Sequence, residues 1–394
     1  MLIRNLKVSR LLSFGPEGID LPMRPLNVLI GANGCGKSNF IEVLNLLRYA
    51  PVRFDSPIMT GGGVKEWLWK GGEFDLDQFA SIEAEVVGNL SDSLQCFRHR
   101  IDFGGSSDRV WVDRESIACG EASTDGKGFT TFYTNHEGNA SIRDDQSNGK
   151  LREMDSSKLD FRVSILSQIR DPEHYHTLDF LQRAYNGIQI YRDWSFGAGS
   201  PMRSSQVPDG PVNDVGREGR NAVTVVASMK RADRNRLVKE MQSLYPEIED
   251  VRVAPAGAGA MQLFIEESGG VQISAERLSD GTLRFLFLLA ILLQPEPPPM
   301  IVIEEPELGL HPDVIPKLAA LLIEASERTQ IVITTHSRML VDALGDDPES
   351  VIVCEKHNGE STFERLDGPR MQDWLERYSL GELWSIGELG GNRW

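Results

Sequence analysis

Four residues of the segment GANGCGKSN, namely Gly31, Gly36, Lys37 and Ser38, have the spacing G-x-x-x-x-G-K-[ST] that holds a nucleoside triphosphate. The glycines let the backbone curl so that its N–H groups face the β-phosphate, where a helix N-terminus adds positive potential. The Lys37 ammonium would reach the β- and γ-phosphates, and the Ser38 hydroxyl would bind Mg²⁺. The alternative is a glycine-rich turn with a surface lysine. The predicted nucleotide contacts are Gly31, Ala32, Asn33, Gly34, Cys35, Gly36, Lys37, Ser38 and Asn39.

Two adjacent carboxylates follow a short apolar run in MIVIEEPELGLHP, residues 300–312. A strand buried on both faces delivers such residues to the carboxyl edge of a parallel sheet, where ligands bind. We expect Glu304 to hold Mg²⁺ through water. Glu305 is expected to polarise the attacking water, because positioning and electrostatics dominate phosphoryl transfer. The alternative is a strand that ends in solvated acids.

A histidine and a capped helix complete the set of candidate chemical groups. His336 ends the apolar run QIVITTHS, which follows Glu305 across an apolar helix, so a βαβ unit would place the two residues on neighbouring strand ends. A lone histidine is more often structural. The segment RLSDGTLRFLFLLAILL, residues 277–293, begins with a serine cap and a glycine and continues as a strongly apolar helix. By itself it is a well-capped buried helix.

In chain order, residues 31–38, 278–282, 301–305 and His336 resemble the Walker A, signature, Walker B and switch-histidine motifs of ABC-type ATPase heads. The branch that the chain looks most like is the RecF/SMC-like group. Within that group it is similar to the stand-alone predicted ATPases (AAA_21-like) related to the overcoming-lysogenization-defect proteins, in which EEPELGLHP and the closing LGELWSIGELGG are typical wording.

The resemblance implies an ATPase that uses Mg²⁺ and converts ATP and water to ADP and phosphate. Its catalytic residues would be Glu305, His336 and Lys37. It also implies a homodimer in which Ser279 and Gly281 contact ATP held by the second subunit. An exposed helix N-terminus is an anion site, which agrees with that role.

Three positions depart from the family pattern. Leu12 stands where many relatives carry Arg or Lys, with Arg10 as a substitute. The glutamine expected between the sheet and helical lobes is not evident; Gln78 is the nearest candidate, and Ser81 occupies the position in another alignment. Asp280 adds a negative charge beside the proposed phosphate contact. These departures leave nucleotide preference and hydrolysis rate open.

The expected fold class is α/β, a P-loop NTPase of the ABC-ATPase head type with a mixed or parallel central sheet, an antiparallel β lobe and an inserted helical lobe. Residues 79–154 alternate as antiparallel strands do. A loop rich in Gly, Pro and Ser, residues 195–221, interrupts a mainly helical region and is expected to be mobile. The predicted domains are residues 1–160 and 249–394, which form the two parts of the head, and the helical lobe, residues 161–248.

Composition indicates a soluble, cytoplasmic protein. The formal net charge of −17 argues against a surface that binds phosphate backbones indiscriminately. The longest apolar run, residues 285–293, is too short to span a bilayer. The four cysteines lie far apart without CxxC spacing, which argues against a zinc site or a disulfide framework. Cys35 either makes the phosphate loop sensitive to oxidation or fills a variable position.

Several uses of the ATP remain open. The dimer would gate a partner effector protein in an antiviral or toxin-like system, act on DNA as RecF-like repair clamps do, or energise a membrane transporter. The transporter is the weakest, because the signature ends in Thr and no coupling membrane segment exists. A nucleotide-dependent scaffold that barely hydrolyses ATP belongs to a different class. The tail after His336 looks too short for a Toprim nuclease, and no heptad arm is present.

Two basic clusters bear on DNA binding. Lys230, Arg231, Arg234, Arg236 and Lys239 would share one helix face, and residues 97–100 (FRHR) form a weaker cluster. A charge run of this size is more often a solvated helix face.

Overall fold

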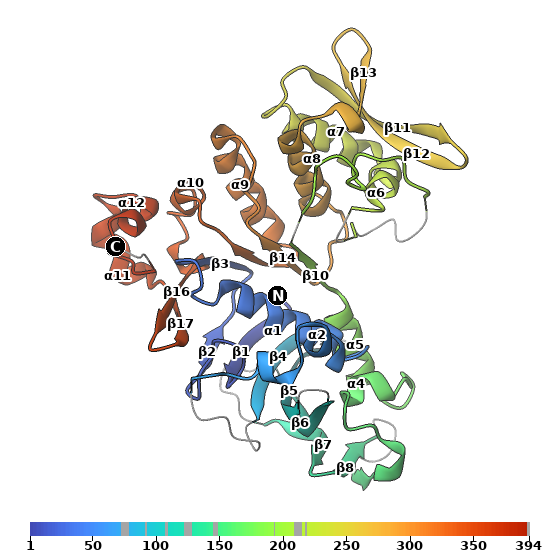
Figure 1. Ribbon diagram of the computed structural model, residues 1–394, viewed down its shortest axis with the longest axis vertical. Coiled ribbons are helices and arrows are strands. Elements are labelled where there is room, and N and C mark those ends of the chain that lie inside the picture. Colours follow the sequence, from blue (N-terminus) through green and yellow to red (C-terminus); the bar gives the residue numbers. More distant parts are fainter. Residues whose placement is uncertain are drawn as a thin grey trace. The chain divides into compact units, whose positions relative to one another are not determined.

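The computed structural model describes residues 1–71, 79–90, 93–106, 109–121, 128–144, 149–192, 194–208, 215–216 and 219–391, and the chain forms two compact units (Figure 1). Unit 1 comprises Met1–Ile188, Ile352–Leu366 and Leu389–Trp394, and unit 2 comprises Gln189–Val351 and Asp367–Glu388. Each unit is therefore built from segments that are far apart in the sequence. In the described part of the chain, no helix is both long and apolar enough to cross a bilayer.

An antiparallel sheet of eight strands, in the order β2-β1-β4-β5-β6-β7-β8-β9, belongs to unit 1. Alternate residues of β4 are buried, because successive side chains of a strand point to opposite faces of the sheet. The sheet confirms the antiparallel strands predicted for residues 79–154. Its strands are β1 (Ile3–Ser9), β2 (Ile19–Pro22), β4 (Ala80–Leu90), β5 (Ser93–Ser106), β6 (Arg109–Glu121), β7 (Thr130–His136), β8 (Asn139–Arg143) and β9 (Leu151–Glu153).

Unit 1 also contains β3 (Leu26–Ile30), which is buried at every residue and leads into the predicted phosphate loop. It neighbours β16 (Val351–His357), which pairs antiparallel with β17 (Glu360–Arg365). Phe40 of α1 (Lys37–Tyr49) packs against Phe363 of β17, with ring centroids 5.4 Å apart. Other helices of unit 1 are α2 (Asp55–Thr60), α3 (Val64–Trp67), α4 (Ile165–Gln168) and α5 (His176–Asn186).

A buried polar network joins β6 to α4 and α5. The Glu115 side chain is 2% exposed, and its carboxylate lies 3.0 Å from His99 Nε2 and accepts from the Ile165 amide at 2.9 Å. The Ser164 hydroxyl donates to the same carboxylate. The other ring nitrogen of His99 lies 3.1 Å from the Tyr185 hydroxyl. The network therefore fixes the helices on the sheet through a single acidic side chain.

We expect Glu115→Ala to lower the free energy of unfolding of unit 1 by about 3 kcal/mol or more, because its buried donors lose their acceptor. Urea titration followed by far-UV circular dichroism measures this loss. The matched control is Lys7→Gln, which removes an exposed ion pair to Asp20 and should change stability by less than about 1 kcal/mol. Equal losses in the two variants would contradict the structural role of Glu115.

Unit 2 contains the parallel strands β14 (Met300–Glu304) and β15 (Gln330–Thr334), in the order β10-β14-β15 with β10 (Ile188–Tyr191). The crossover between β14 and β15 runs through α9 (Ile315–Ser326), as the predicted βαβ unit requires. All five residues of β15 are buried, which agrees with the apolar runs typical of parallel strands.

The second part of unit 2 surrounds α8 (Asp280–Leu292), whose residues from Leu283 onward are buried. The helices α6 (Ala222–Ser228) and α7 (Arg231–Met241) contact α8 and the antiparallel sheet of β11 (Ile248–Gly257), β12 (Ala260–Glu267) and β13 (Val271–Ser274) (Figure 1). Further along the chain, α10 (Arg338–Asp342) contacts α12 (Leu380–Ser385), which follows α11 (Gly368–Leu375).

Candidate functional site

The loop between β3 and α1 has backbone angles that favour glycine. Gly31, Gly34 and Gly36 have φ of 148°, 80° and 111°. A Cβ at Gly31 would lie 2.2 Å from the Cys354 carbonyl oxygen of β16, so any side chain there would push the strand away. The end of the described chain also lies here, since a Cβ at Gly391 would be 3.3 Å from the Gly31 Cα.

The Lys37 side chain is folded onto this loop. It is 7% exposed, and its ammonium donates to the carbonyls of Gly31 at 2.7 Å and Ala32 at 3.1 Å. The helix α1 begins after Gly36 without a side-chain cap, so the first-turn amides gain no acceptor from that source. An ammonium and a helix N-terminus at one loop attract an anion, which fits the phosphates of a nucleotide. Ser38, in the same turn, is exposed.

Two serines that the sequence analysis missed support the loop. The Ser361 hydroxyl donates to Ser13 Oγ at 2.7 Å, and the Asn39 amide donates to the same oxygen at 2.7 Å. A Cβ at Gly36 would lie 2.4 Å from Ser361 Oγ, so the glycine permits this close contact. The side-chain amide of Asn39, a predicted nucleotide contact, is therefore engaged in the hydrogen bond to Ser13. Asn33 and Gly34 are exposed at the tip of the loop.

Two cysteine thiols meet beside Lys37. A hydrogen bond with the Cys354 thiol, opposed by burial and aided by the Lys37 ammonium 3.8 Å away, lowers the pKa of Cys35 to about 6. Burial raises the pKa of Cys354 above its ordinary value. The lowered pKa favours the thiolate form of Cys35, although the side chain is only 3% exposed.

We expect Cys35 to be alkylated by iodoacetamide with a pH midpoint of about 6, because the thiolate is the reactive form. Pulses of reagent between pH 5 and pH 9, followed by peptide mass spectrometry, give the profile. Cys96 is the internal control, since burial raises its pKa and should keep it unlabelled across this range. A Cys35 midpoint near the ordinary thiol value of about 8.5 would contradict the thiolate.

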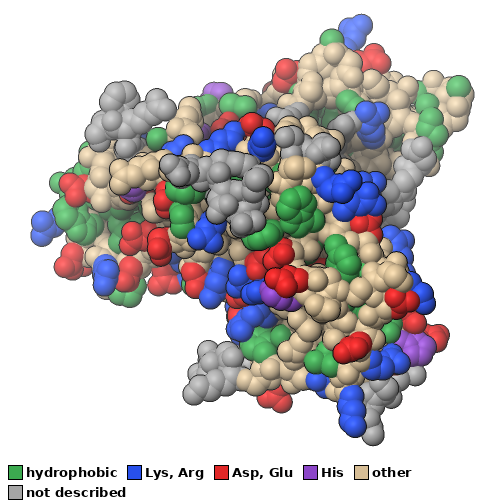
Figure 2. Space-filling view, turned by 60° about the horizontal axis from the view of Figure 1, so that its bottom comes forward, with side chains coloured by type: hydrophobic (Ala, Val, Ile, Leu, Met, Phe, Trp, Pro, Cys, Tyr) green, Lys and Arg blue, Asp and Glu red, His purple; other side chains and the backbone are tan. Residues whose placement is uncertain are grey.

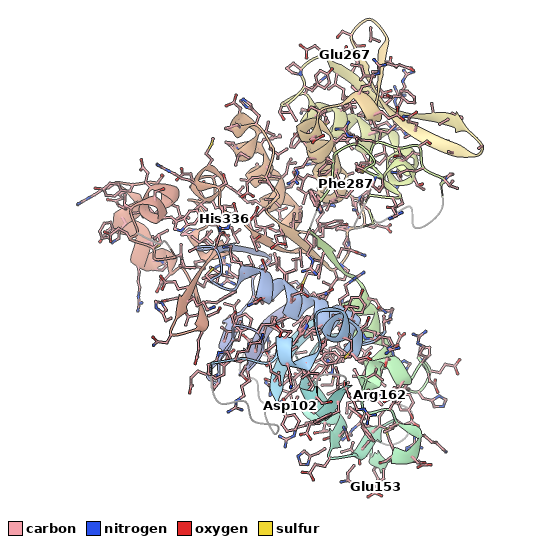
Figure 3. All side chains as sticks on the ribbon, in the orientation of Figure 1. Asp102, Glu153, Arg162, Glu267, Phe287 and His336 are labelled. Atoms are coloured by element: carbon pink, nitrogen blue, oxygen red, sulfur yellow. The ribbon has the colours of Figure 1, made fainter. Side chains whose placement is uncertain are left out.

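In unit 2, the structure places Glu304 and Glu305 at the carboxyl end of β14 and His336 beyond the end of β15. His336 is labelled in Figure 3. Its Nε2 lies 3.8 Å from Glu305 Oε1, and each side chain is 37% exposed. Glu305 has a φ of 47°, and its amide donates to the Thr334 carbonyl at 3.1 Å. A left-handed non-glycine residue held in this way is typical of functional sites.

Glu307, which the sequence analysis did not single out, holds the turn at His336. Its Oε1 accepts from the Thr335 hydroxyl at 2.6 Å and from the His336 amide at 3.1 Å. Burial raises the pKa of Glu307, and its Oε2 is buried without a hydrogen-bond partner among the described residues. The available signal was a third carboxylate in EEPE, two positions after Glu305.

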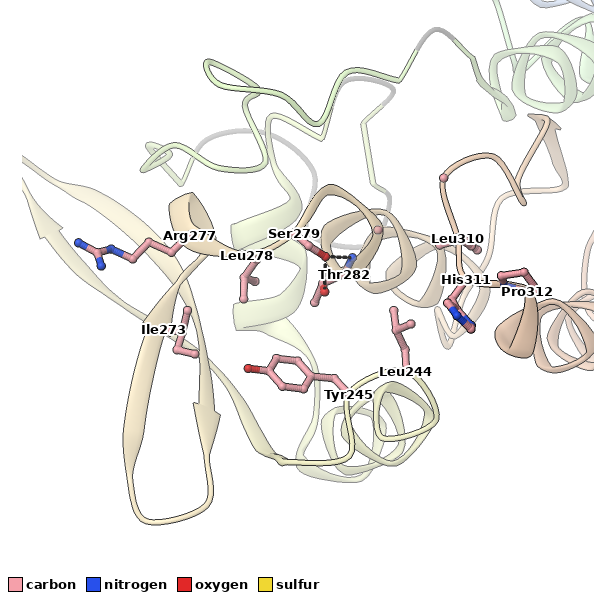
Figure 4. Close-up of a pocket in the computed structure, with 12 residues that line it drawn as sticks. Leu244, Tyr245, Ile273, Arg277, Leu278, Ser279, Thr282, Leu310, His311 and Pro312 are labelled. Atoms are coloured by element: carbon pink, nitrogen blue, oxygen red, sulfur yellow. Dashed lines mark hydrogen bonds between the residues drawn. The ribbon is translucent and has the colours of Figure 1, made fainter.

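The predicted signature lies at the start of α8. Ser279 caps the helix by accepting from the Thr282 amide at 3.1 Å. A Cβ at Gly281 would lie 2.9 Å from the Gly309 carbonyl oxygen, so the glycine lets the segment after β14 approach. A cavity of about 740 Å³ opens at this point (Figure 4). Its described lining includes the basic side chain of Arg277 and the His311 imidazole, which lies 3.4 Å from the Asp313 carboxylate.

One arginine connects the signature helix to the carboxylate turn. Arg284 of α8 is 9% exposed, and its Nη1 donates to the Glu305 carbonyl at 3.4 Å. Its guanidinium also lies over the rings of Trp194 and Phe196, at 5.3 and 5.2 Å from their centroids. Burial lowers the pKa of Arg284. Arg284 therefore links α8 to the backbone of Glu305.

Among the described residues, no three His, Cys, Asp or Glu side chains gather as a metal site. Magnesium in nucleotide sites usually takes one or two protein oxygens and completes its shell with phosphates and water. The exposed Ser38 hydroxyl and the partly exposed Glu304 carboxylate are oxygen donors of the kind required, and they belong to unit 1 and unit 2 respectively.

Two of the three departures from the family pattern concern residues in the amino-terminal half of the chain. Gln78 lies outside the described residues. Ser81 lies on β4, and its hydroxyl donates to Asp102 at 2.6 Å. Arg10 and Leu12 both adopt left-handed backbone angles, with φ of 55° and 53°.

The chain is similar to solved heads of Smc ATPases. It matches "SmcHead bound to the C-winged helix domain of ScpA" with a TM-score of 0.55 at 15% identity, covering 93% of this chain and 99% of that one. A Pyrococcus furiosus Smc head bound to the C-terminal domain of ScpA gives a TM-score of 0.55 at 14% identity, covering 95% and 98%. A Pyrococcus yayanosii Smc head gives 0.51 at 10% identity, covering 95% and 99%.

At these identities the matches show the fold, which is that of an ABC-type P-loop ATPase head. No curated protein matches the chain. A family model described as "AAA domain, putative AbiEii toxin, Type IV TA system" matches residues 26–342, which include all four predicted motifs. The chain therefore belongs to this AAA_21 family of P-loop ATPases.

Proposed function

We propose that the protein binds ATP with Mg²⁺, hydrolyses it to ADP and phosphate, and works as a nucleotide-driven dimeric switch. The observation that carries the hydrolysis is the pairing of Glu305 with His336 at 3.8 Å, at the ends of two parallel strands. The match to the AAA_21 family model and the loop that holds Lys37 support nucleotide binding.

Each proposed role follows from the chemistry of the side chain. Lys37 exchanges its contacts with the loop carbonyls for the phosphate oxygens, because an ammonium gains more from an anion than from a neutral acceptor. Glu305 orients the attacking water and takes its proton, and His336 donates to the γ-phosphate. When bound by Ser38 and Glu304, Mg²⁺ supplies charge neutralisation at the phosphates.

The dimer would form when Ser279 and Gly281 of one chain meet the nucleotide held by a second chain. The cavity at the start of α8 supports this role, since its described lining offers the helix N-terminus and Arg277 to an anion. Closure with ATP and release after hydrolysis would make a two-state switch.

The proposed output is regulation of a separate effector protein in an antiviral or toxin-like system. The family description names a toxin–antitoxin system, and two of the similar Smc heads were solved with a bound domain of ScpA. Both observations favour a protein partner for this head. Such an effector would bind the closed dimer and the open chain with different affinities.

Phosphate release and molar mass by light scattering test the proposal on the full chain, with ATP–Mg²⁺ as the ligand. Turnover with a mass increase that depends on ATP supports the switch. A monomer without turnover at saturating ATP would overturn it.

A DNA-binding role is the alternative, and the basic clusters give it little support. In the FRHR cluster, Arg98 pairs with Glu85 at 2.7 Å and His99 is buried in the core. In the α7 cluster, Arg236 pairs with Glu324. On the face drawn in Figure 2, basic and acidic side chains are interspersed. Duplex DNA that stimulates turnover and binds with a steep salt dependence would favour this alternative.

A further inference from the structure

Arg203 belongs to the segment predicted to be a mobile loop, yet it is bound to the signature turn. Its side chain is 12% exposed. One terminal nitrogen, Nη1, donates to the backbone carbonyls of Ala275 at 3.2 Å, Glu276 at 3.0 Å and Leu278 at 2.7 Å. These carbonyls belong to the residues immediately before Ser279, so one guanidinium sets the path of the backbone into α8.

The same guanidinium forms an ion pair with Asp280 through its second terminal nitrogen, Nη2. Its Nε donates to the Phe196 carbonyl, which holds the head of the side chain from the other side. Arginine suits this position because its planar fork presents five donors in fixed directions, whereas lysine offers one point charge.

Asp280 lies between the two residues proposed to meet the phosphates, Ser279 and Gly281, and its side chain is 68% exposed. A carboxylate at that position repels an approaching triphosphate. The Arg203 charge offsets this repulsion at its source.

We propose that Arg203 is a positioning residue that shapes the signature turn and neutralises Asp280, so that Ser279 and Gly281 can receive the nucleotide of a second copy of the chain. This inference rests on the proposed function, because it concerns the ATP-dependent dimer. Through Arg203, the segment of residues 195–208 would act directly on dimer closure.

The test uses the Glu305→Gln background, in which hydrolysis is expected to be blocked. Dimerisation with saturating ATP–Mg²⁺ is measured by sedimentation velocity, and binding of a fluorescent ATP analogue is measured at concentrations where the chain is monomeric. Adding Arg203→Gln should weaken the dimer at least about tenfold, the scale expected for lost charge-assisted hydrogen bonds. Nucleotide affinity of the monomer should stay within about twofold, since Arg203 does not belong to the Lys37 loop.

Three further variants separate charge, shape and folding. Arg203→Lys should recover part of the dimer affinity, because it restores the charge but not the fork. Asp280→Asn combined with Arg203→Gln should also recover part of it, because it removes the uncompensated carboxylate. Arg252→Gln is the matched control in the same unit, since Arg252 forms ion pairs with Asp250 and Glu266 on β11 and β12 and should leave the dimer unchanged.

The outcomes distinguish this inference from the proposed function. If Glu305→Gln alone does not dimerise with ATP, the proposed function fails. If it dimerises and Arg203→Gln dimerises equally well, the role of Arg203 is wrong. A Glu305→Gln, Arg203→Gln variant whose loss is not relieved by Asp280→Asn overturns the charge compensation.

Discussion

Glu305→Gln is expected to lower the turnover number for ATP at least about 100-fold, the scale of a lost general base. Glutamine keeps the size of the side chain but cannot take a proton from water at neutral pH. Binding should survive, because the phosphate loop and Lys37 are unchanged. The ATP-bound dimer should therefore accumulate instead of turning over.

Phosphate release and light scattering on the same preparation measure both effects. The control is Glu327→Gln, an exposed carboxylate at the end of α9 that should leave turnover unchanged. Equal turnover in the wild type and Glu305→Gln would remove Glu305 from its role and favour the scaffold that barely hydrolyses ATP. A dimer that forms equally well without ATP would separate assembly from the nucleotide.

Lys37→Met is expected to weaken binding of ATP–Mg²⁺ at least about tenfold. The variant lacks the one ammonium that, among the described residues, donates to this loop. It should also cost about 1–3 kcal/mol of stability, since the carbonyls of Gly31 and Ala32 lose a buried donor. Isothermal titration gives the affinity, and thermal unfolding without nucleotide gives the stability.

Lys70→Met is the control, because Lys70 is 60% exposed and pairs with Glu66. Its affinity for ATP–Mg²⁺ should equal that of the wild type. If Lys37→Met binds ATP–Mg²⁺ normally, the loop is not the nucleotide site, whatever its backbone conformation.

Local sequence patterns were sufficient for the elements that carry the motifs. The apolar run before Glu304 and the apolar run that ends at His336 predicted buried strands, and the structure has β14 and β15 there. The period of two in residues 79–154 predicted the antiparallel sheet. These patterns succeed because strand and helix periodicity is a property of neighbouring residues. The domain limits at residues 160 and 248 and the roles of the site residues stay predictions.

The missing parts depend on contacts between distant residues. Ser13 and Ser361 meet across 348 positions, and neither residue belongs to a recognisable motif. Arg203 contacts a turn more than 70 residues ahead of it, from within a segment whose composition indicates only a loop. The FRHR cluster shows the opposite error, because an apparent basic patch contains a core histidine that is bonded to Glu115. Charge in a sequence does not reveal which charges are already paired.

The position of Gly391 has a practical consequence for engineering the protein. Its amide donates to Glu355 Oε1 at 2.8 Å, and its Cα lies close enough to Gly31 that an added methyl group would touch the glycine. Gly391 also has a φ of 72°, which a residue with a side chain rarely adopts. A larger residue at position 391 would therefore press on the Walker A backbone within the same unit.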